Sequence, residues 1–170
     1  MSMKLKKIIE SNFVFDALKK FKKHIVVEID DKKIKLPIFR ERYFFYLFNS
    51  KCNCCGLEGS HFAINEQLLK DEKSLYHLNF ISFVNNKYTL LTKDHIIPRS
   101  RGGKNCNDNY QLLCEYCNGI KSNSLISNNQ LYSLTLLQNE KNCFQNNKEK
   151  KDYIKNVREH MILINNLVVE

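Results

Sequence analysis

Two cysteine pairs of the same spacing constrain the fold of this chain more than any other feature. Cys52 and Cys55 are separated by two residues, and so are Cys114 and Cys117. Two intervening residues let both sulfurs of a pair bind one ion, and four thiolates close a tetrahedral zinc site that has no open coordination position. The pattern therefore predicts a structural Zn²⁺ that ties two distant segments of the chain together.

The remaining cysteines do not suggest a disulfide framework. The chain contains seven cysteines, an odd number, and its first residues lack the apolar stretch and cleavage site of a secretory signal. Cys54 leaves an ambiguity, because it can take the place of Cys52 or Cys55, but only the Cys52/Cys55 choice gives the standard spacing. Cys106 and Cys143 have no partner at ligand spacing and are interpreted as ordinary small residues.

Composition is that of an ordinary globular protein, and the positive charge is consistent with a polyanionic partner. Of its 170 residues, 43% are hydrophobic and 26% are charged, in the ordinary range for a folded domain. No apolar run approaches the roughly 18 residues of a transmembrane helix, so we expect no membrane partner and a cytoplasmic location. The net charge of +9 favours nucleic acid as the partner. Abundant Lys and Asn also fit an AT-rich genome, which weakens the argument from charge alone.

The first 50 residues predict a helical and hairpin scaffold. Apolar spacing predicts an amphipathic helix over 3–23, a hairpin over 24–29 and 34–38, and a short aromatic helix over 40–50. We favour a packing role for this segment. The alternative is a nucleic-acid-binding arm that uses its lysines, namely Lys4, Lys6, Lys7, Lys19, Lys20, Lys22 and Lys23.

The rest of the chain predicts an α+β arrangement. Two strands over 75–83 and 87–92 are joined at Asn85-Asn86, a short helix covers 118–125, and a capping box of Ser127 and Gln130 begins another helix. A last helix over 148–166 carries an apolar stripe, which is either the seam of a homodimer or, as we prefer, a face that packs on its own domain. The predicted domains are a scaffold (1–50), a core with an inserted hairpin (51–126) and a helical extension (127–170).

Between the cysteine pairs lies a group of residues suited to phosphodiester hydrolysis. That reaction needs a base for water, a cation for the developing oxyanion and groups that hold both. His95 has the intrinsic pKa of a base. Asp94 and Asn118 offer hard oxygen ligands that suit Mg²⁺ or Mn²⁺. Asn109 can make a hydrogen bond that fixes the orientation of the His95 ring.

The chain after this group predicts a loop. Adjacent residues of a regular strand face opposite ways, so the strand must bend or end at Asp94-His95 if both serve one centre. Pro98 and the pair Gly102-Gly103 are consistent with such an end. Nearby basic residues suit phosphate contacts, although a solvated basic loop explains them nearly as well. They are Arg99, Arg101, Lys104 and Lys121.

The motif Asp-His-Ile-x-Pro-x-Ser-x-Gly-Gly from Asp94, followed by Asn-x-Gln-x-Leu-Cys-x-x-Cys-Asn-x-x-Lys from Asn109, resembles the zinc-stapled HNH endonucleases. The resemblance extends over about residues 52–121 and is dense from 93 to 121. It implies a ββα-metal, treble-clef-like core in which His95 activates water and Asn109 holds His95. It also implies that Asp94 and Asn118 bind a divalent ion that stabilises the leaving 3′ oxygen, giving 5′-phosphate and 3′-hydroxyl ends.

Two departures from the family pattern accompany this resemblance. The third family position is Asn118 rather than histidine, which is an accepted variant, and the insertion over 57–90 is long. The resemblance favours an enzyme that nicks or cuts DNA, from a phage, a mobile element or a defence system. The alternatives are a zinc-stabilised nucleic-acid-binding module without hydrolytic activity and an RNA-cleaving enzyme built on the same residues.

Overall fold

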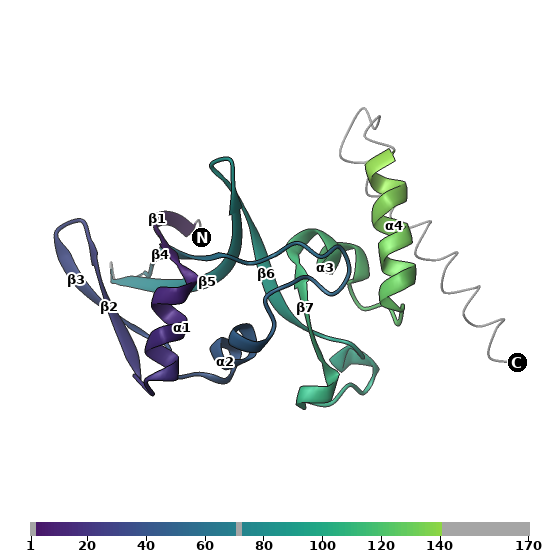
Figure 1. Cartoon of the computed structure of the whole chain (residues 1–170), viewed down its shortest axis with the longest axis horizontal. Helices are drawn as coiled ribbons and strands as arrows, with labels where there is room; N and C mark the ends of the chain where they lie inside the picture. Colours follow the sequence, from purple (N-terminus) through teal and green to yellow (C-terminus); the bar gives the residue numbers. More distant parts are fainter. Residues whose placement is uncertain (1–2, 71–72, 141–170) are drawn as a thin grey trace, which may run out of the picture. The chain divides into compact units, whose positions relative to one another are not determined.

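The computed structural model describes residues 3–70 and 73–140, which form two compact units (Figure 1). Unit 1 contains the chain up to Lys51 and residues 57–93, and unit 2 contains residues 52–56 and the chain from Asp94 onward. Helices and antiparallel strands are mixed, so the predicted α+β class is confirmed. Within the described residues no helix is both long and apolar enough to cross a membrane.

Unit 1 is built on two antiparallel sheets. The larger sheet has five strands, of which four lie wholly or mostly in unit 1. Their hydrogen-bonded order is β1 (Met3–Glu10), β4 (His61–Leu68), β5 (Ser74–Val84) and β6 (Lys87–His95). The smaller is the hairpin of β2 (His24–Ile29) and β3 (Lys32–Pro37).

Both predicted hairpins are confirmed, although the turn of the first is two residues and not the four (30–33) expected, because β3 already begins at Lys32. Asp30 and Asp31 connect β2 to β3, and Asn85 and Asn86 connect β5 to β6. All four residues have positive φ, between 49° and 59°, as the tight two-residue turns of twisted hairpins require. Asn and Asp tolerate this left-handed conformation better than most residues do.

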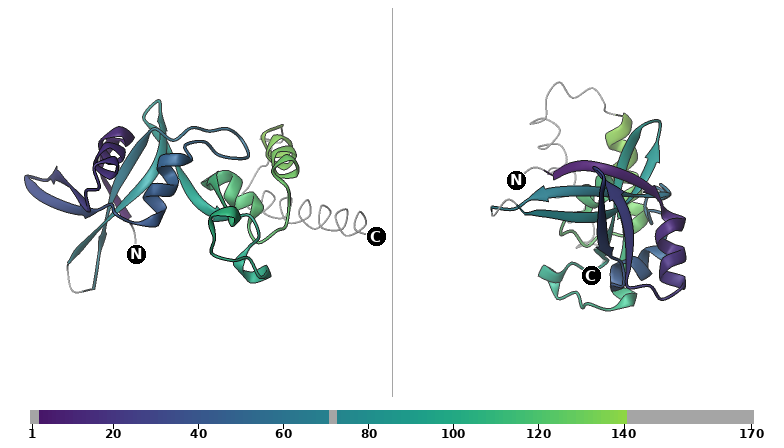
Figure 2. Two further views of the ribbon diagram at one scale, coloured as in Figure 1. Left: turned by 60° about the horizontal axis from the view of Figure 1, so that its bottom comes forward. Right: turned by 90° about the vertical axis from the view of Figure 1, so that its left-hand side faces the viewer.

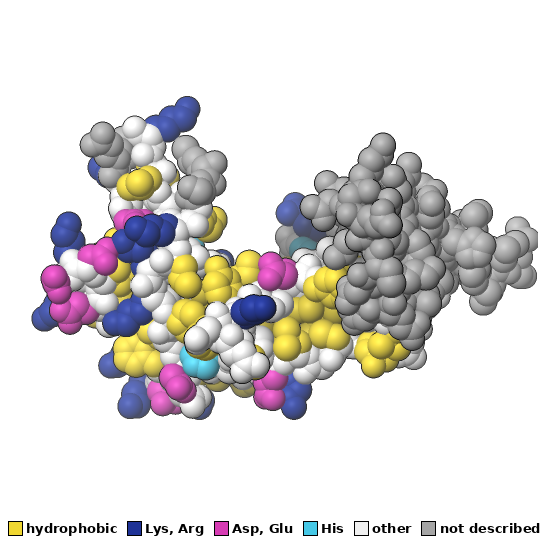
Figure 3. Space-filling view, turned by 90° about the horizontal axis from the view of Figure 1, so that it is seen from above, with side chains coloured by type: hydrophobic (Ala, Val, Ile, Leu, Met, Phe, Trp, Pro, Cys, Tyr) yellow, Lys and Arg dark blue, Asp and Glu magenta, His cyan; other side chains and the backbone are white. Residues whose placement is uncertain are grey.

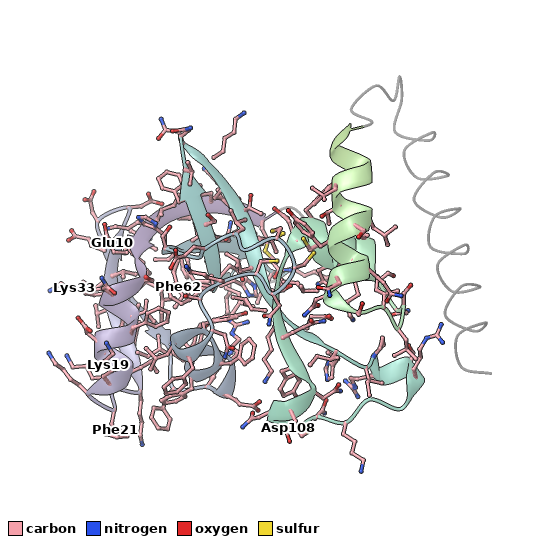
Figure 4. All side chains as sticks on the ribbon, turned by 45° about the vertical axis from the view of Figure 1, so that its right-hand side comes forward. Glu10, Lys19, Phe21, Lys33, Phe62 and Asp108 are labelled. Atoms are coloured by element: carbon pink, nitrogen blue, oxygen red, sulfur yellow. The ribbon has the colours of Figure 1, made fainter. Side chains whose placement is uncertain are left out.

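An aromatic core holds unit 1 together between the larger sheet and the helices α1 (Ser11–Lys19) and α2 (Glu41–Phe48). Phe62 of β4 is fully buried, and the Phe80 ring beside it lies 5.1 Å away between centroids (Figure 4). Three further rings complete the cluster, namely Phe15, Tyr43 and Tyr46. The aromatic helix predicted over 40–50 is confirmed as α2, which supplies Tyr43 and Tyr46 to this cluster.

The helix predicted over 3–23 is wrong in its first half. Residues Met3–Glu10 form β1, which pairs with β4, and the helix begins only at Ser11. The apolar spacing of this segment fits a helix, but pairing with β4 satisfies its backbone and outweighs local propensity. β4 itself was not predicted, because Phe62 to Asn65 are buried without the alternation that marks a half-exposed strand.

Unit 2 contains the end of β6, followed by β7 (Tyr110–Cys114), α3 (Glu115–Lys121) and α4 (Asn128–Glu140), seen from two further sides in Figure 2. α3 contacts both β7 and α4. The buried aliphatic residues in the described part of unit 2 are Leu112, Leu113, Ile120, Leu131 and Leu134.

Two helix predictions in unit 2 are now resolved. The helix expected over 118–125 begins earlier, at Glu115, and ends at Lys121, so that Cys117 lies within it. The capping box is confirmed, because the Gln130 amide N–H donates to Ser127 Oγ and the Ser127 N–H donates to Gln130 Oε1. The helix predicted over 148–166 and Cys143 lie outside the described residues.

Candidate active site and metal centre

Four cysteine sulfurs gather beside β7 and α3 of unit 2. The Sγ atoms of Cys52, Cys55, Cys114 and Cys117 all lie within 4.8 Å of one another, and the Cys55 and Cys114 sulfurs are 3.8 Å apart. The yellow sulfur atoms of Figure 4 lie close to α3, where Cys117 is buried. Zinc–sulfur bonds of about 2.3 Å in a tetrahedron place neighbouring sulfurs about 3.8 Å apart. The spacing of the four sulfurs therefore fits a zinc ion.

The sulfurs are close enough for hydrogen bonds between them to shift the pKa of individual thiols. Hydrogen bonds from the Cys114 and Cys117 thiols lower the pKa of Cys52, whereas hydrogen bonds with the Cys114 and Cys52 sulfurs, together with burial, raise the pKa of Cys117. A bound metal would let all four be thiolates. Cys54, the alternative ligand, is half-buried and lies outside this group of four.

Asp94 lies near the end of β6, and one of its two carboxylate oxygens is held by polar contacts. Its Oδ2 accepts a hydrogen bond from Gln111 Nε2 at 3.2 Å and forms an ion pair with Lys121 Nζ at 2.9 Å. Within the described part of the chain both contacts fall on Oδ2, so Oδ1 carries none. The side chain is 18% exposed. A partly exposed carboxylate with one oxygen fixed and the other available is suited to binding a cation.

His95 ends β6, and its ring contacts two residues of unit 2. Its Nε2 lies 2.8 Å from Asn105 Oδ1, and the ring packs edge-on against Tyr110 with centroids 4.9 Å apart. Because a side-chain carbonyl oxygen only accepts hydrogen bonds, this contact places the proton of the neutral imidazole on Nε2. Nδ1 is then the nitrogen with a lone pair.

Asn109 contacts the backbone of the loop rather than the ring of His95, unlike the contact expected from the sequence. Its Oδ1 accepts from the Ile97 N–H, and its Nδ2 donates to the carbonyls of Ile97 and Lys104. Its own carbonyl accepts from the N–H of Ile96, directly after β6. The buried Asn109 therefore fixes the loop that follows His95, and any effect on the ring is indirect.

Two glycines allow this loop to close. Gly102 has φ +84°, a conformation that favours glycine. A Cβ at Gly103 would overlap the Ile97 carbonyl and would lie 2.9 Å from Asn109 Nδ2. The loop that terminates β6 was predicted from Pro98 and this glycine pair. Positive φ explains the glycine at 102, and close packing against Ile97 explains the glycine at 103.

The other predicted site residues fall into two groups. Asn118 lies on α3 one turn before Lys121, so the two share a face of the helix. Arg99, Arg101 and Lys104 are exposed, and Arg101 Nε donates to the Asn123 carbonyl at 2.8 Å.

Lys121 requires a correction, because it does not join these exposed basic residues. It is 1% exposed, and its Nζ donates to the His95 carbonyl at 2.7 Å besides contacting Asp94. A buried lysine of this kind cannot act as the surface phosphate contact expected from the sequence. Instead it connects α3 to the two residues at the end of β6.

Sequence reasoning missed Asn105 and gave no role to Gln111, although Gln111 belongs to the motif that carries the resemblance. Asn105 lies in a polar loop, where nothing in the local pattern distinguishes it from the neighbouring asparagines. Gln111 carried a usable signal, because it is polar within the buried strand β7, with an exposed fraction of 3%. Buried polar side chains need partners, and the partner of Gln111 is Asp94.

Comparison with known proteins gives one match. No curated protein and no solved structure matches the chain at a significant level. A family model does match, and the matched segment begins in β5 and ends just after α3, so it includes Asp94, His95 and the second cysteine pair. The resemblance predicted from the motifs is thus confirmed, because residues 81–124 match the family described as HNH endonuclease.

Proposed function

We propose that this protein is a metal-dependent endonuclease that hydrolyses phosphodiester bonds in DNA, with its active centre at the end of β6. The HNH match implies nuclease activity in general. The observation that carries the finer proposal is the convergence on Asp94 and His95 of polar groups from three segments, namely Asn105, Gln111 and Lys121. Such groups hold a base and an acidic ligand in fixed positions, as catalysis requires.

The elements around this centre support a ββα-metal core as its scaffold. β6 and β7 are followed directly by α3, giving the strand, strand, helix order that the resemblance implies. The four cysteines fix β7 and α3 to residues 52–55, and we assign a structural Zn²⁺ to them. The metal would thereby hold the element that carries Asn118 and Lys121.

In this proposal His95 acts as the general base through Nδ1. Asn105 Oδ1 accepts a hydrogen bond from the Nε2–H group, and in this tautomer Nδ1 has the lone pair that can take a proton from water. As Nδ1 gains that proton the imidazole becomes positively charged, and the Asn105 carbonyl oxygen stabilises the charge through the same hydrogen bond. Tyr110 limits the motion of the ring by packing against its side.

Asp94 and Asn118 would hold the catalytic divalent ion, Mg²⁺ or Mn²⁺. Hard oxygen ligands suit these ions, and Asp94 has Oδ1 available. When bound, the ion would supply electrostatic stabilisation of the leaving 3′ oxygen. Since the Lys121 ammonium already neutralises much of the Asp94 charge, we expect weak binding of the ion until the phosphate of the substrate adds negative charge.

Plasmid cleavage tests the proposal. We expect the wild-type protein to relax or linearise supercoiled DNA when Mg²⁺ or Mn²⁺ is present, with ends that carry 5′-phosphate and 3′-hydroxyl groups. His95→Ala should lose at least about 100-fold in rate, the usual contribution of a general base. Intact plasmid under every metal tried would support a non-catalytic nucleic-acid-binding module, and cleavage of RNA but not DNA would identify a ribonuclease.

A further inference from the structure

Most of the net charge of the protein belongs to unit 1 and not to the segment that carries Asp94 and His95. Unit 1 contains 17 Lys and Arg against 10 Asp and Glu, a net charge of +7. Residues 94–140 of unit 2 contain four of each, a net charge of zero. On the face shown in Figure 3, the dark blue Lys and Arg side chains are most numerous over the end of unit 1 that carries β2 and β3. Unit 1 therefore provides most of the attraction for a polyanion.

A groove in unit 1 collects part of this charge together with apolar side chains. It has a volume of about 680 Å³ and lies where the end of α1 meets β2. Phe13 and Val26, both about half exposed, contribute apolar surface. Asp16 is its one acidic residue, and its Oδ1 forms an ion pair with Lys19 Nζ at 3.6 Å. The basic residues that line the groove are Lys20, Lys22 and Lys23, all exposed.

Phe21, in the middle of these lysines, has a conformation that stability alone does not explain. The Lys22 N–H donates to the Ala17 carbonyl and the Phe21 N–H to the Leu18 carbonyl, which together end α1 in a Schellman motif. The residue at this point takes a left-handed conformation and is usually glycine, but here Phe21 has φ 54°. Its side chain is also 77% exposed (labelled in Figure 4). A large aromatic ring is thus held in solvent in a backbone conformation that disfavours it.

We propose that this basic aromatic patch, defined by Phe13, Lys20, Phe21, Lys22 and Lys23, binds a single-stranded segment of nucleic acid. The lysines would contact successive phosphates, and the exposed rings would stack on unpaired bases, a combination that is typical of single-strand binding. Besides its three lysines the patch exposes only the two phenylalanine rings, with Val26 of the groove beside them. This favours a nucleic-acid strand over a membrane, which would require a broader apolar face. The inference extends the proposed nuclease function by naming where its substrate is held.

Binding measured without divalent metal tests the patch separately from hydrolysis. Fluorescence anisotropy in EDTA would compare labelled oligo-dT with a duplex of the same length, at several salt concentrations. We expect tighter binding of oligo-dT. Phe21→Gly should weaken it by roughly tenfold, the order expected for loss of one stacked base, and Phe13→Ala should weaken it as well. Because glycine suits the left-handed position, Phe21→Gly should melt no lower than wild type.

Charge variants provide an independent measurement. Replacing Lys20, Lys22 and Lys23 by Gln should reduce the slope of log affinity against log salt by about 2, since each phosphate contact on a single strand contributes roughly 0.7. The matched control replaces Lys32, Lys33 and Lys35, which are exposed in the same unit, and should leave the slope nearly unchanged. Phe48→Ala, at 81% exposure, is the control for the aromatic variants.

Three results would overturn the patch. The first is an equal loss of affinity in the patch and control lysine variants, which would indicate general electrostatic attraction. The second is unchanged binding in Phe21→Gly and Phe13→Ala. The third is patch-dependent binding to vesicles containing phosphatidylserine without patch-dependent binding to oligo-dT. Patch-dependent binding by a protein that cleaves nothing would contradict only the nuclease proposal, and cleavage with unaltered binding of the patch variants would contradict only the patch.

Discussion

Unit 1 and unit 2 use different means to hold their folds. Unit 1 buries a cluster of aromatic rings, including Phe62 and Phe80, beneath a four-stranded part of the larger sheet. The described part of unit 2 has a smaller aliphatic core and four cysteine sulfurs within 4.8 Å of one another. Small cores often need a metal for stability, whereas a core with several buried aromatic rings does not. We therefore expect the folding of unit 2 to depend on bound metal and unit 1 to stay folded without it.

The units also differ in what they offer to a substrate. Unit 1 has a net charge of +7 and the basic aromatic patch, while residues 94–140 have no net charge but contain Asp94 and His95. Such a separation would let attraction of the substrate and hydrolysis be changed independently. The following variants test the comparison, beginning with the largest expected effect.

Cys114→Ser should unfold unit 2 while unit 1 remains folded. Structural zinc contributes about 10–16 kcal/mol to small zinc-dependent folds, so losing one ligand removes much of the stability of this unit. Metal analysis should show loss of zinc, and hydrogen exchange should show loss of protection in β7 and α3 but not in β4 and β5. The control is Cys106→Ser, an exposed cysteine outside the group of four. Full protection of β7 in zinc-free Cys114→Ser would refute a structural role for the metal.

Phe62→Ala should have the opposite distribution of effects. Removing a fully buried aromatic ring costs about 3–5 kcal/mol, and the loss should fall on unit 1. Hydrogen exchange in β4 and β5 at increasing denaturant concentration measures this loss of stability. Phe48→Ala is the exposed control. Zinc content should remain that of wild type. A variant that released zinc as readily as it lost the structure of unit 1 would show that the two units do not fold by separate means.

Lys121→Met should lower the stability of unit 2 by about 1–3 kcal/mol, because Asp94 and the His95 carbonyl each lose a partner. Since Asp94 is partly exposed, water can replace some of the lost interaction. We expect a lower rate of cleavage at saturating substrate together with the lower stability, and Lys104→Met, which is exposed, should change neither. If both variants lost affinity for nucleic acid equally and kept normal stability, Lys121 would be a phosphate contact, as expected from the sequence.

Local patterns in the sequence predicted the features that depend on neighbouring residues. The two cysteine pairs were recognised because two-residue spacing suits a metal, and both hairpins were recognised from turn residues that accept positive φ. The capping box at Ser127 was predicted for the same reason, since both partners lie within four residues. The α+β class followed from these elements together.

Apart from the gathering of the two cysteine pairs, the features that depend on distant partners were not predicted. Met3–Glu10 becomes a strand only because β4 is available to pair with it, and β4 carries no alternating pattern of its own. The burial of Lys121 depends on Asp94, 27 positions earlier, and the contact of His95 with Asn105 depends on how the loop closes. These are tertiary effects, which outweigh local propensity and are not encoded in residue spacing.

The most direct test of the central claim is the single-turnover rate of DNA cleavage at saturating enzyme, in Mg²⁺, for wild type, His95→Ala and Phe21→Gly. Saturation removes differences in binding, so the rate reports the chemical step alone. We predict a loss of at least about 100-fold in His95→Ala and a rate within about twofold of wild type in Phe21→Gly. Cleavage by His95→Ala at the wild-type rate would contradict the assignment of hydrolysis to the end of β6.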